Sequence, residues 1–172
     1  MEKKELFKFS EKRRDWLEAS GEELLKECRF DAFKSTGKGG QKRNKTSSAL
    51  RLIHSRSGIS VSADGSRYQR ENRSEALKKL KYAIAVEYRC PAPDEIPFEN
   101  IEMSTSNKNY HLWTAYILDV FYDSDFDLKT AAERCGVSPS KLVKLVYRDS
   151  LLWQELKRVM ESLGLKALRP PA

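Results

Sequence analysis

Apolar and polar residues alternate over three short stretches in the first half of the chain. This alternation predicts strands at residues 28–34, 49–54 and 59–62, because successive side chains of a strand point to opposite faces. Residues 55–58, Ser-Arg-Ser-Gly, are typical of a turn between two of these strands. We therefore expect the three strands to form a small, mainly antiparallel sheet.

Helical spacing appears on both sides of the predicted sheet. Residues 10–27 have helical character, with Ser10 as a candidate cap and residues 21–25 as a second candidate start. From residue 70 to 87 apolar residues recur at helical intervals, at Ala76, Leu77, Leu80, Ala83, Ile84 and Val86. The predicted fold class is α+β, with the sheet packed on a helix.

The second half of the chain is predicted to be helical. Asn109 is a candidate cap for a helix to about residue 122, and a last helix is expected over residues 151–163. Residues 128–146 have the spacing of a helix-turn-helix. Its signs are a small residue at the helix contact, a turn glycine, a cap and a proline at the first helical position: Ala132, Gly136, Ser138 and Pro139.

Four regions follow from these patterns. An N-terminal helical segment (1–27) precedes a sheet-containing domain (28–89). Residues 90–107 contain three prolines and several acidic residues, and we interpret them as a linker. A helical C-terminal module with the helix-turn-helix-like motif occupies residues 108–172.

The net charge of +7 is distributed unevenly along the chain. Residues 28–89 contain fifteen basic and five acidic side chains, and residues 128–172 contain nine and four. Residues 90–127 contain one basic and eight acidic side chains, so two basic regions flank an acidic one. Such segregation favours a surface that binds a polyanion.

Composition also argues against several classes of protein. No apolar run is long enough to span a membrane, and the N-terminus lacks an apolar signal core. The three cysteines lack metal-ligand spacing and the chain has two histidines, so we expect reduced thiols, a cytoplasmic location and no metal.

The connection between the first two predicted strands is rich in glycine and basic residues. Gly37, Gly39 and Gly40 allow backbone angles that other residues avoid, so their amides can approach a ligand closely. Six basic residues and no carboxylate lie in this part of the chain, which suits binding to RNA phosphates: Lys34, Lys38, Lys42, Arg43, Lys45 and Arg51.

A nucleotide-binding P-loop is the rival interpretation of this connection. Gly39 and the Asn44-Lys45-Thr46 triplet nearly match the motif, but Asn44 stands where a glycine is required. A P-loop also precedes a long helix, whereas an alternating strand follows here. The sequence context therefore disfavours a P-loop.

Several motifs together resemble the catalytic domain of class-I peptide chain release factors, over about residues 28–88. They are Arg29-Phe30-Asp31, Ser35-Thr36-Gly37-Lys38-Gly39-Gly40-Gln41, Asn44-Lys45-Thr46, Ala49 to His54, Ser57 to Val61, and Arg67, Gln69, Asn72 and Arg73 in order. Lys38, Lys42-Arg43 and Tyr68 differ from the residues usual in that family, although rescue-type relatives carry a similar Ser-Arg-Tyr-Gln stretch.

The resemblance implies a catalytic site at Gly39, Gly40 and Gln41 that enters the peptidyl transferase centre. Gln41 would place a water molecule against the ester of peptidyl-tRNA, and its backbone N–H would stabilise the developing oxyanion. Its side chain would admit water and exclude larger nucleophiles. The resemblance implies neither a metal nor another cofactor.

The resemblance also implies a ribosomal partner. We expect a monomer that contacts large-subunit rRNA and peptidyl-tRNA and binds no membrane. Only 27 residues precede the sheet-containing domain, which is short for a codon-reading domain, so codon-independent ribosome rescue is the leading hypothesis.

The C-terminal module admits two interpretations. It is either a nucleic-acid-binding element, with Ser140, Lys141, Lys144 and Arg148 on the exposed face of its second helix, or a helical bundle with solvated cations. The messenger channel and small-subunit rRNA are its candidate partners. In the sheet-containing domain, Arg67, Gln69 and Asn72 either brace the turn into the following helix or contact the ribosome, with Arg67 as the candidate RNA contact. Two other functions stay open: a non-catalytic ribosome or RNA binder, and a DNA-binding regulator.

Overall fold

The computed structural model describes residues 3–33 and 49–171. Its internal contacts divide the chain into two units. The sheet unit comprises residues 15–84, and the helical unit comprises residues 1–14 together with 85–172. Each unit is described by itself below.

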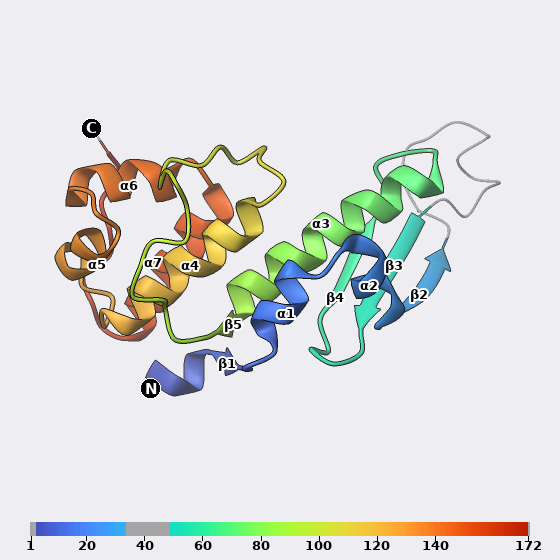
Figure 1. Ribbon diagram of the computed structural model, residues 1–172, viewed down its shortest axis with the longest axis horizontal. Helices are drawn as coiled ribbons and strands as arrows, with labels where there is room; N and C mark the ends of the chain where they lie inside the picture. The colour runs from blue at the N-terminus through green and yellow to red at the C-terminus, as the bar shows by residue number, and fades with distance from the viewer. Residues whose placement is uncertain (1–2, 34–48, 172) are drawn as a thin grey trace. The chain divides into compact units, whose positions relative to one another are not determined.

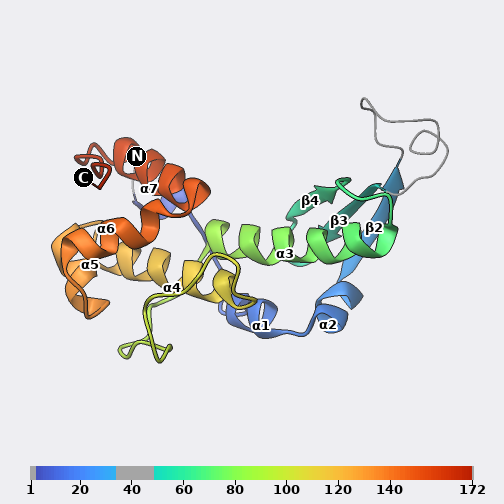
Figure 2. The same cartoon turned by 90° about the horizontal axis from the view of Figure 1, so that it is seen from above.

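The sheet unit contains a three-stranded antiparallel sheet (Figure 1). Strand β3 (Ala49–His54) lies between β2 (Cys28–Phe33) and β4 (Ser60–Ala63). Helix α3 (Gln69–Glu87) lies along one side of the sheet, as Figure 2 shows from above. The predicted α+β class, with a small antiparallel sheet on a helix, is confirmed.

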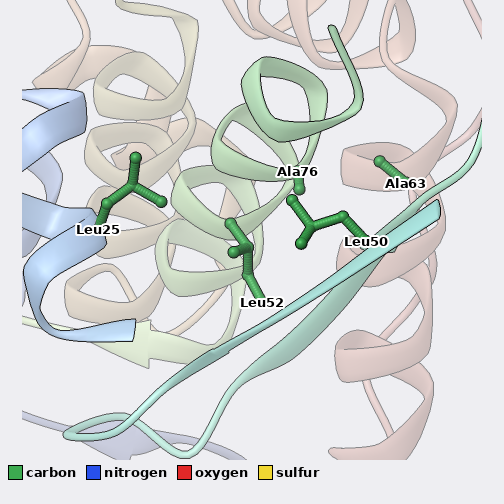
Figure 3. Packing of buried hydrophobic residues seen from close by; sticks show 5 residues of the cluster. All are labelled: Leu25, Leu50, Leu52, Ala63 and Ala76. Atoms are coloured by element: carbon green, nitrogen blue, oxygen red, sulfur yellow. The ribbon is translucent and has the colours of Figure 1, made fainter. Parts of the chain in front are cut away.

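The core of the sheet unit lies between the sheet and helices α2 and α3. Leu50 and Leu52 alternate along β3 and point to the same face, where they meet Leu25, Ala63 and Ala76 (Figure 3). Each leucine buried in this way contributes about 1.5–3 kcal/mol to folding. Because the strand period is two, Arg51 between the leucines faces the opposite side and is exposed.

Two short helices replace the single helical region predicted for residues 10–27. Helix α1 (Arg13–Glu18) ends before Ser20, and α2 (Gly21–Lys26) starts after it. The Glu23 backbone N–H donates to Ser20 Oγ (3.2 Å), and the Ser20 backbone N–H donates to Glu23 Oε2 (2.8 Å). This capping box begins a new helix at the predicted second start.

Helix α4 (Tyr110–Asp123) occupies the centre of the helical unit. Its residues from Trp113 to Phe121 are buried without interruption, so it has no single apolar face. Helices α5 (Leu128–Arg134), α6 (Pro139–Tyr147) and α7 (Ser150–Ser162) follow it (Figure 1). Asn109 precedes α4, but no capping hydrogen bond from its side chain is found among the described residues.

The N-terminal segment adds elements that the apolar pattern did not predict. A 3₁₀ helix η1 (Lys3–Leu6) precedes strand β1 (Lys8–Phe9), which pairs in parallel with β5 (Tyr88–Arg89). A ladder of two residues is too short to produce a recognisable alternation.

The helix-turn-helix geometry is confirmed in α5 and α6. Gly136 has a positive φ of 66°, and a Cβ there would lie 3.3 Å from Ile96 Cδ1. Ser138 Oγ accepts the Lys141 backbone N–H at 3.2 Å, and Pro139 is the first residue of α6. The positive φ therefore favours glycine at this turn, and a Cβ there would also require a small shift of the exposed Ile96 side chain.

The acidic segment between β5 and α4 has no helix or strand but is anchored to the helical unit. The Trp113 Nε1–H donates to the Ile101 carbonyl at 2.8 Å, and the ring of Phe98 lies edge-on to that of Tyr116, with centroids 5.7 Å apart.

The domain boundaries proposed from the sequence stay a prediction. In the described ranges, no helix is both long and apolar enough to cross a membrane.

Candidate functional site

The predicted catalytic loop connects two paired strand ends. Phe33, the last residue of β2, pairs with Ala49, the first residue of β3. The antiparallel pairing continues to Cys28 and His54, so both attachment points of the loop belong to one continuous ladder. Eight predicted site residues lie outside the described residues: Lys34, Lys38, Gly39, Gly40, Gln41, Lys42, Arg43 and Lys45.

The end of the ladder far from the loop is fixed by a buried histidine. The His54 side chain is fully buried; its Nδ1 accepts the Ser57 backbone N–H (3.2 Å), so Nε2 carries the proton that faces Glu27 Oε2 at 3.2 Å. Ser57 Oγ in turn accepts the Ile59 backbone N–H at 3.2 Å. A serine, a histidine and a carboxylate thus lie together here. Because His54 is buried and these hydrogen bonds are local, the group stabilises the turn and is not a catalytic site.

The sheet face opposite the core carries cations close to the loop attachment. Arg51 pairs in register with Asp31, and its guanidinium carbon lies 5.7 Å from the centroid of the Phe33 ring. Arg29 has a side chain that is 71% exposed and lies 3.8 Å from Asp31. An exposed ion pair at this distance contributes at most about 1 kcal/mol, so these arginines remain available to an anionic ligand.

The turn between β4 and α3 lies at the same end of the sheet. Ala63 pairs with Leu50, one residue from the loop attachment at Ala49. Asn72 is buried; its Oδ1 accepts the Ser66 backbone N–H (2.9 Å) and its Nδ2–H donates to the Ser66 carbonyl (2.8 Å). Asn72 thus braces the turn, whereas Arg67 is exposed and stacks on Tyr68.

The three cations predicted on the second helix of the motif differ in their surroundings, and Arg148 follows the last residue of α6. Lys141 and Arg148 both contact Glu102 of the acidic segment, at 2.5 Å and 3.9 Å, whereas Lys144 is exposed. The hydrogen bond from Lys141 is the main cause that lowers the pKa of the Glu102 carboxyl. Glu102 therefore offsets part of the positive charge of the helix-turn-helix.

Nucleophilic and metal chemistry have little support in the described parts of the chain. No group of three or more histidine, cysteine or acidic side chains within residues 3–33 and 49–171 could hold a metal ion. All three cysteines are free thiols. Burial raises the pKa of Cys28 and of Cys135 to about 11 and also raises that of Cys90, so each thiol is protonated near neutral pH and is a poor nucleophile.

Sequence reasoning missed two features of these surfaces. The sequence indicates Glu102 only as part of an acidic linker, because its partner Lys141 on α6 lies about forty residues away in the chain. The sequence also does not indicate that the rings of Phe30 and Tyr68 are both exposed. An edge strand leaves even its core-facing residues partly open, and strand alternation alone does not reveal this.

Comparison with known proteins identifies the family. Residues 22–110, just over half of the chain, match the family model described as the RF-1 domain. This range contains the whole ladder of β2 and β3 and the segment that connects them. The chain belongs to the class-I peptide chain release factor family.

Individual relatives are peptide chain release factors. Peptide chain release factor 1 of Lacticaseibacillus casei (strain BL23) is 50% identical over 147 residues, which cover 81% of this chain and 39% of the relative. Peptide chain release factor 1 of Lachnoclostridium phytofermentans is 47% identical over 57 residues, 33% of this chain and 16% of the relative. Peptide chain release factor 2 of Pseudothermotoga lettingae is 39% identical over 85 residues, 48% of this chain and 23% of the relative. The chain thus spans well under half the length of these curated relatives.

Proposed function

We propose that this protein hydrolyses the ester bond of peptidyl-tRNA on the ribosome, independently of the codon in the decoding site. The observation that carries the proposal is the position of Gly39-Gly40-Gln41. The triplet lies between two strand ends that pair with each other, inside the range that matches the RF-1 domain. The cations on the described part of this unit suit a partner made of RNA.

The proposed chemistry needs no side-chain nucleophile. Water attacks the ester carbonyl, and the backbone N–H of Gln41 donates a hydrogen bond to the oxyanion that develops. Gly39 and Gly40 allow the backbone conformation that directs this amide, and the Gln41 side chain excludes nucleophiles larger than water. Positioning by ribosomal RNA supplies much of the remaining rate enhancement.

A release assay on stalled ribosomes tests the catalytic part. Ribosomes that carry labelled peptidyl-tRNA are mixed with the wild type, with Gln41→Ala, or with Gln154→Ala, which removes an exposed glutamine of α7 as a matched control. Gln41→Ala should lose peptide release while it still co-sediments with ribosomes, and Gln154→Ala should release peptide as the wild type does. Gly40→Val should slow release by about 10²–10³-fold if the glycine directs the oxyanion donor.

The same assay distinguishes a catalyst from a binder. If the wild type binds every stalled complex offered but frees no more peptide than Gln41→Ala, hydrolysis is rejected and a non-catalytic ribosome binder remains.

Codon independence requires its own comparison. Complexes that differ only in the decoding site are prepared with a stop codon, with a sense codon, or with a messenger that ends before this site. We expect similar release rates in all three. Release confined to the stop-codon complex would reject the rescue role and leave the hydrolytic activity in place.

The helical unit is proposed to bind RNA of the small subunit or of the messenger channel. Lys144 is exposed on α6. Lys141 and Arg148 become available when RNA phosphate groups replace the Glu102 carboxylate as their partner. The protein is further proposed to act in the cytoplasm, as a monomer and without a membrane partner.

A further inference from the structure

Two aromatic rings of the sheet unit are exposed, and each has an arginine over it. Phe30 on β2 is 40% exposed, and the Arg73 guanidinium carbon lies 5.0 Å from the centroid of its ring. Tyr68 is 52% exposed, with the Arg67 guanidinium carbon 4.8 Å from its ring centroid. The Arg67 Nη2–H also donates to the Tyr68 hydroxyl at 2.7 Å, which fixes the two groups side by side.

The Tyr68 pair lies at the end of the sheet where the catalytic loop is attached, and Phe30 lies three residues from that attachment, opposite Leu52. Tyr68 immediately precedes α3, and Arg73 lies on the second turn of that helix, roughly 7.5 Å further along its axis. The start of α3 follows β4, whose last residue Ala63 pairs with Leu50 beside the loop attachment. Figures 1 and 2 both show the start of α3 at this end of the sheet.

Other exposed rings of the protein have a structural explanation. Phe9 is 50% exposed and lies edge-on to Tyr122, with ring centroids 5.4 Å apart. Tyr147 is 45% exposed and lies edge-on to Trp153 at 5.0 Å. Both rings extend aromatic clusters of the helical unit, whereas Phe30 and Tyr68 are combined with cations on a strongly basic surface.

Flat rings next to guanidinium groups fit one kind of ligand well. Unpaired nucleotide bases stack on aromatic faces and on guanidinium planes, while arginine also binds the phosphates. Bases inside a duplex are already stacked on each other and cannot reach such rings. Residues 28–89 contain fifteen basic and five acidic side chains, so their positive charge is complementary to the negative charge of that ligand.

We propose that Phe30, Arg67, Tyr68 and Arg73 form a stacking surface that binds unpaired nucleotides of RNA next to the catalytic loop. The inference rests on the proposed ribosomal partner and specifies how that partner is bound. Arg67 and Arg73 hold the sugar-phosphate backbone, and the rings hold the bases. This surface distinguishes single-stranded RNA from a duplex, which charge alone does not do.

Binding of a labelled oligoadenylate, measured by fluorescence anisotropy without ribosomes, tests the stacking surface. The full chain should bind the single strand more tightly than the same strand annealed to its complement. Tyr68→Ala should weaken single-strand binding by about 5- to 150-fold, the loss expected for one stacked base. Phe30→Leu keeps an apolar group but removes the ring, and it should also weaken single-strand binding.

Two further variants separate loss of the ring from other effects. Tyr68→Phe keeps the ring and should keep most of the affinity. Phe9→Ala removes an equally exposed ring of the helical unit and should leave the affinity unchanged. The proposal is overturned if Tyr68→Ala, with an unchanged melting temperature, binds the single strand as tightly as the wild type. It is also overturned if the duplex and the single strand bind equally, because phosphate contacts then explain all the binding.

The two proposals can fail separately. A protein that frees no peptide but shows ring-dependent binding of single-stranded RNA loses only the hydrolytic function. A protein that frees peptide but binds oligoadenylate without regard to Tyr68 and Phe30 loses only the stacking surface.

Discussion

Two arginines are buried inside the helical unit, whereas the described arginines of the sheet unit lie on its surface. Arg13 and Arg89 are buried and share the carboxylate of Asp119, which also accepts the Cys90 backbone N–H at 3.2 Å. In the sheet unit, Arg29, Arg51 and Arg67 are exposed. Arginine therefore stabilises the fold in the helical unit, whereas in the sheet unit it is available to a ligand.

Burial of these charges in the helical unit has a clear cost. Two guanidinium groups share one carboxylate, and the Nε atoms of Arg13 and Arg89 find no hydrogen-bond partner among the described residues. Burial lowers the pKa of Arg89 to about 10, although the nearby Asp119 carboxylate acts to raise it. Such a group stabilises little by itself, but it joins the start of α1, β5 and α4, and a shift of any one of them would leave a buried charge unpaired.

The surface of α6 is intermediate between these two cases. Lys141 and Arg148 are partly exposed but both contact Glu102. An RNA phosphate must therefore compete with a carboxylate on α6, whereas it meets arginines stacked on rings at Phe30 and Tyr68. Under the proposed function, this difference predicts that the sheet unit supplies most of the RNA affinity.

The largest effect is expected from removal of the shared carboxylate. Asp119→Ala leaves two buried guanidinium groups without their counter-charge and should lower the free energy of unfolding by about 3–5 kcal/mol. Arg29→Ala in the sheet unit removes an exposed cation and should change it by less than about 1 kcal/mol. Urea denaturation followed by circular dichroism measures both. Equal losses in the two variants would show that the ion pairs of the buried arginines contribute no more to stability than an exposed arginine does.

A second test concerns the apolar core that holds the loop attachment. Leu52→Ala opens a cavity at a fully buried position of β3 and should cost about 2–5 kcal/mol. Ile53→Ala, one residue further on and facing the opposite side of the sheet, should cost less because that side chain is only half-buried. Hydrogen exchange of the β2 and β3 amides measures the local loss. If Ile53→Ala speeds the exchange of these amides as much as Leu52→Ala does, the core does not lie on the face of the sheet that carries Leu50 and Leu52.

Local sequence rules predicted much of this fold. Alternation around Leu50 and Leu52 located β3 at residues 49–54, and the Ser138-Pro139 pair located the start of α6. These signals act within a few residues, so the sequence displays them directly. The family resemblance also rests on local motifs, and the match over residues 22–110 confirms it.

Long-range contacts could not be predicted in the same way. The ion pair between Arg13 and Asp119 joins residues more than one hundred positions apart, and nothing near either residue in the sequence indicates the other. The contacts of Glu102 with Lys141 and Arg148 are of the same kind. The roles of Gly39, Gly40 and Gln41 stay predictions, because these residues lie outside the described residues.

Helix caps should behave alike in the two units, in contrast to the arginines. Ser20 caps α2 in the sheet unit and Ser138 caps α6 in the helical unit, each with a hydrogen bond to a backbone N–H at 3.2 Å. Ser20→Ala and Ser138→Ala should each cost about 1 kcal/mol in thermal denaturation. Ser74→Ala, at an exposed position inside α3, is the matched control and should cost nothing, because alanine favours helix. A cost at Ser74 similar to that at the caps would contradict this account.

The smallest effect is expected at Glu102, whose titration reports how firmly α6 is paired. Its pKa is lowered from the ordinary 4.5 in the folded protein, chiefly by the hydrogen bond from Lys141 and less by the charge of Arg148. A carboxyl with a depressed folded pKa binds fewer protons than it does in the unfolded chain, so its stabilising contribution is present above pH 4.5 and is lost as the pH falls through the folded value. Carbon-13 NMR titration of the Glu102 carboxyl should therefore give a midpoint below 4.5, which Lys141→Met raises more than Arg148→Met does. If neither variant moves the midpoint, Glu102 does not hold these cations in solution, and α6 is as open to phosphate as the arginines of the sheet unit.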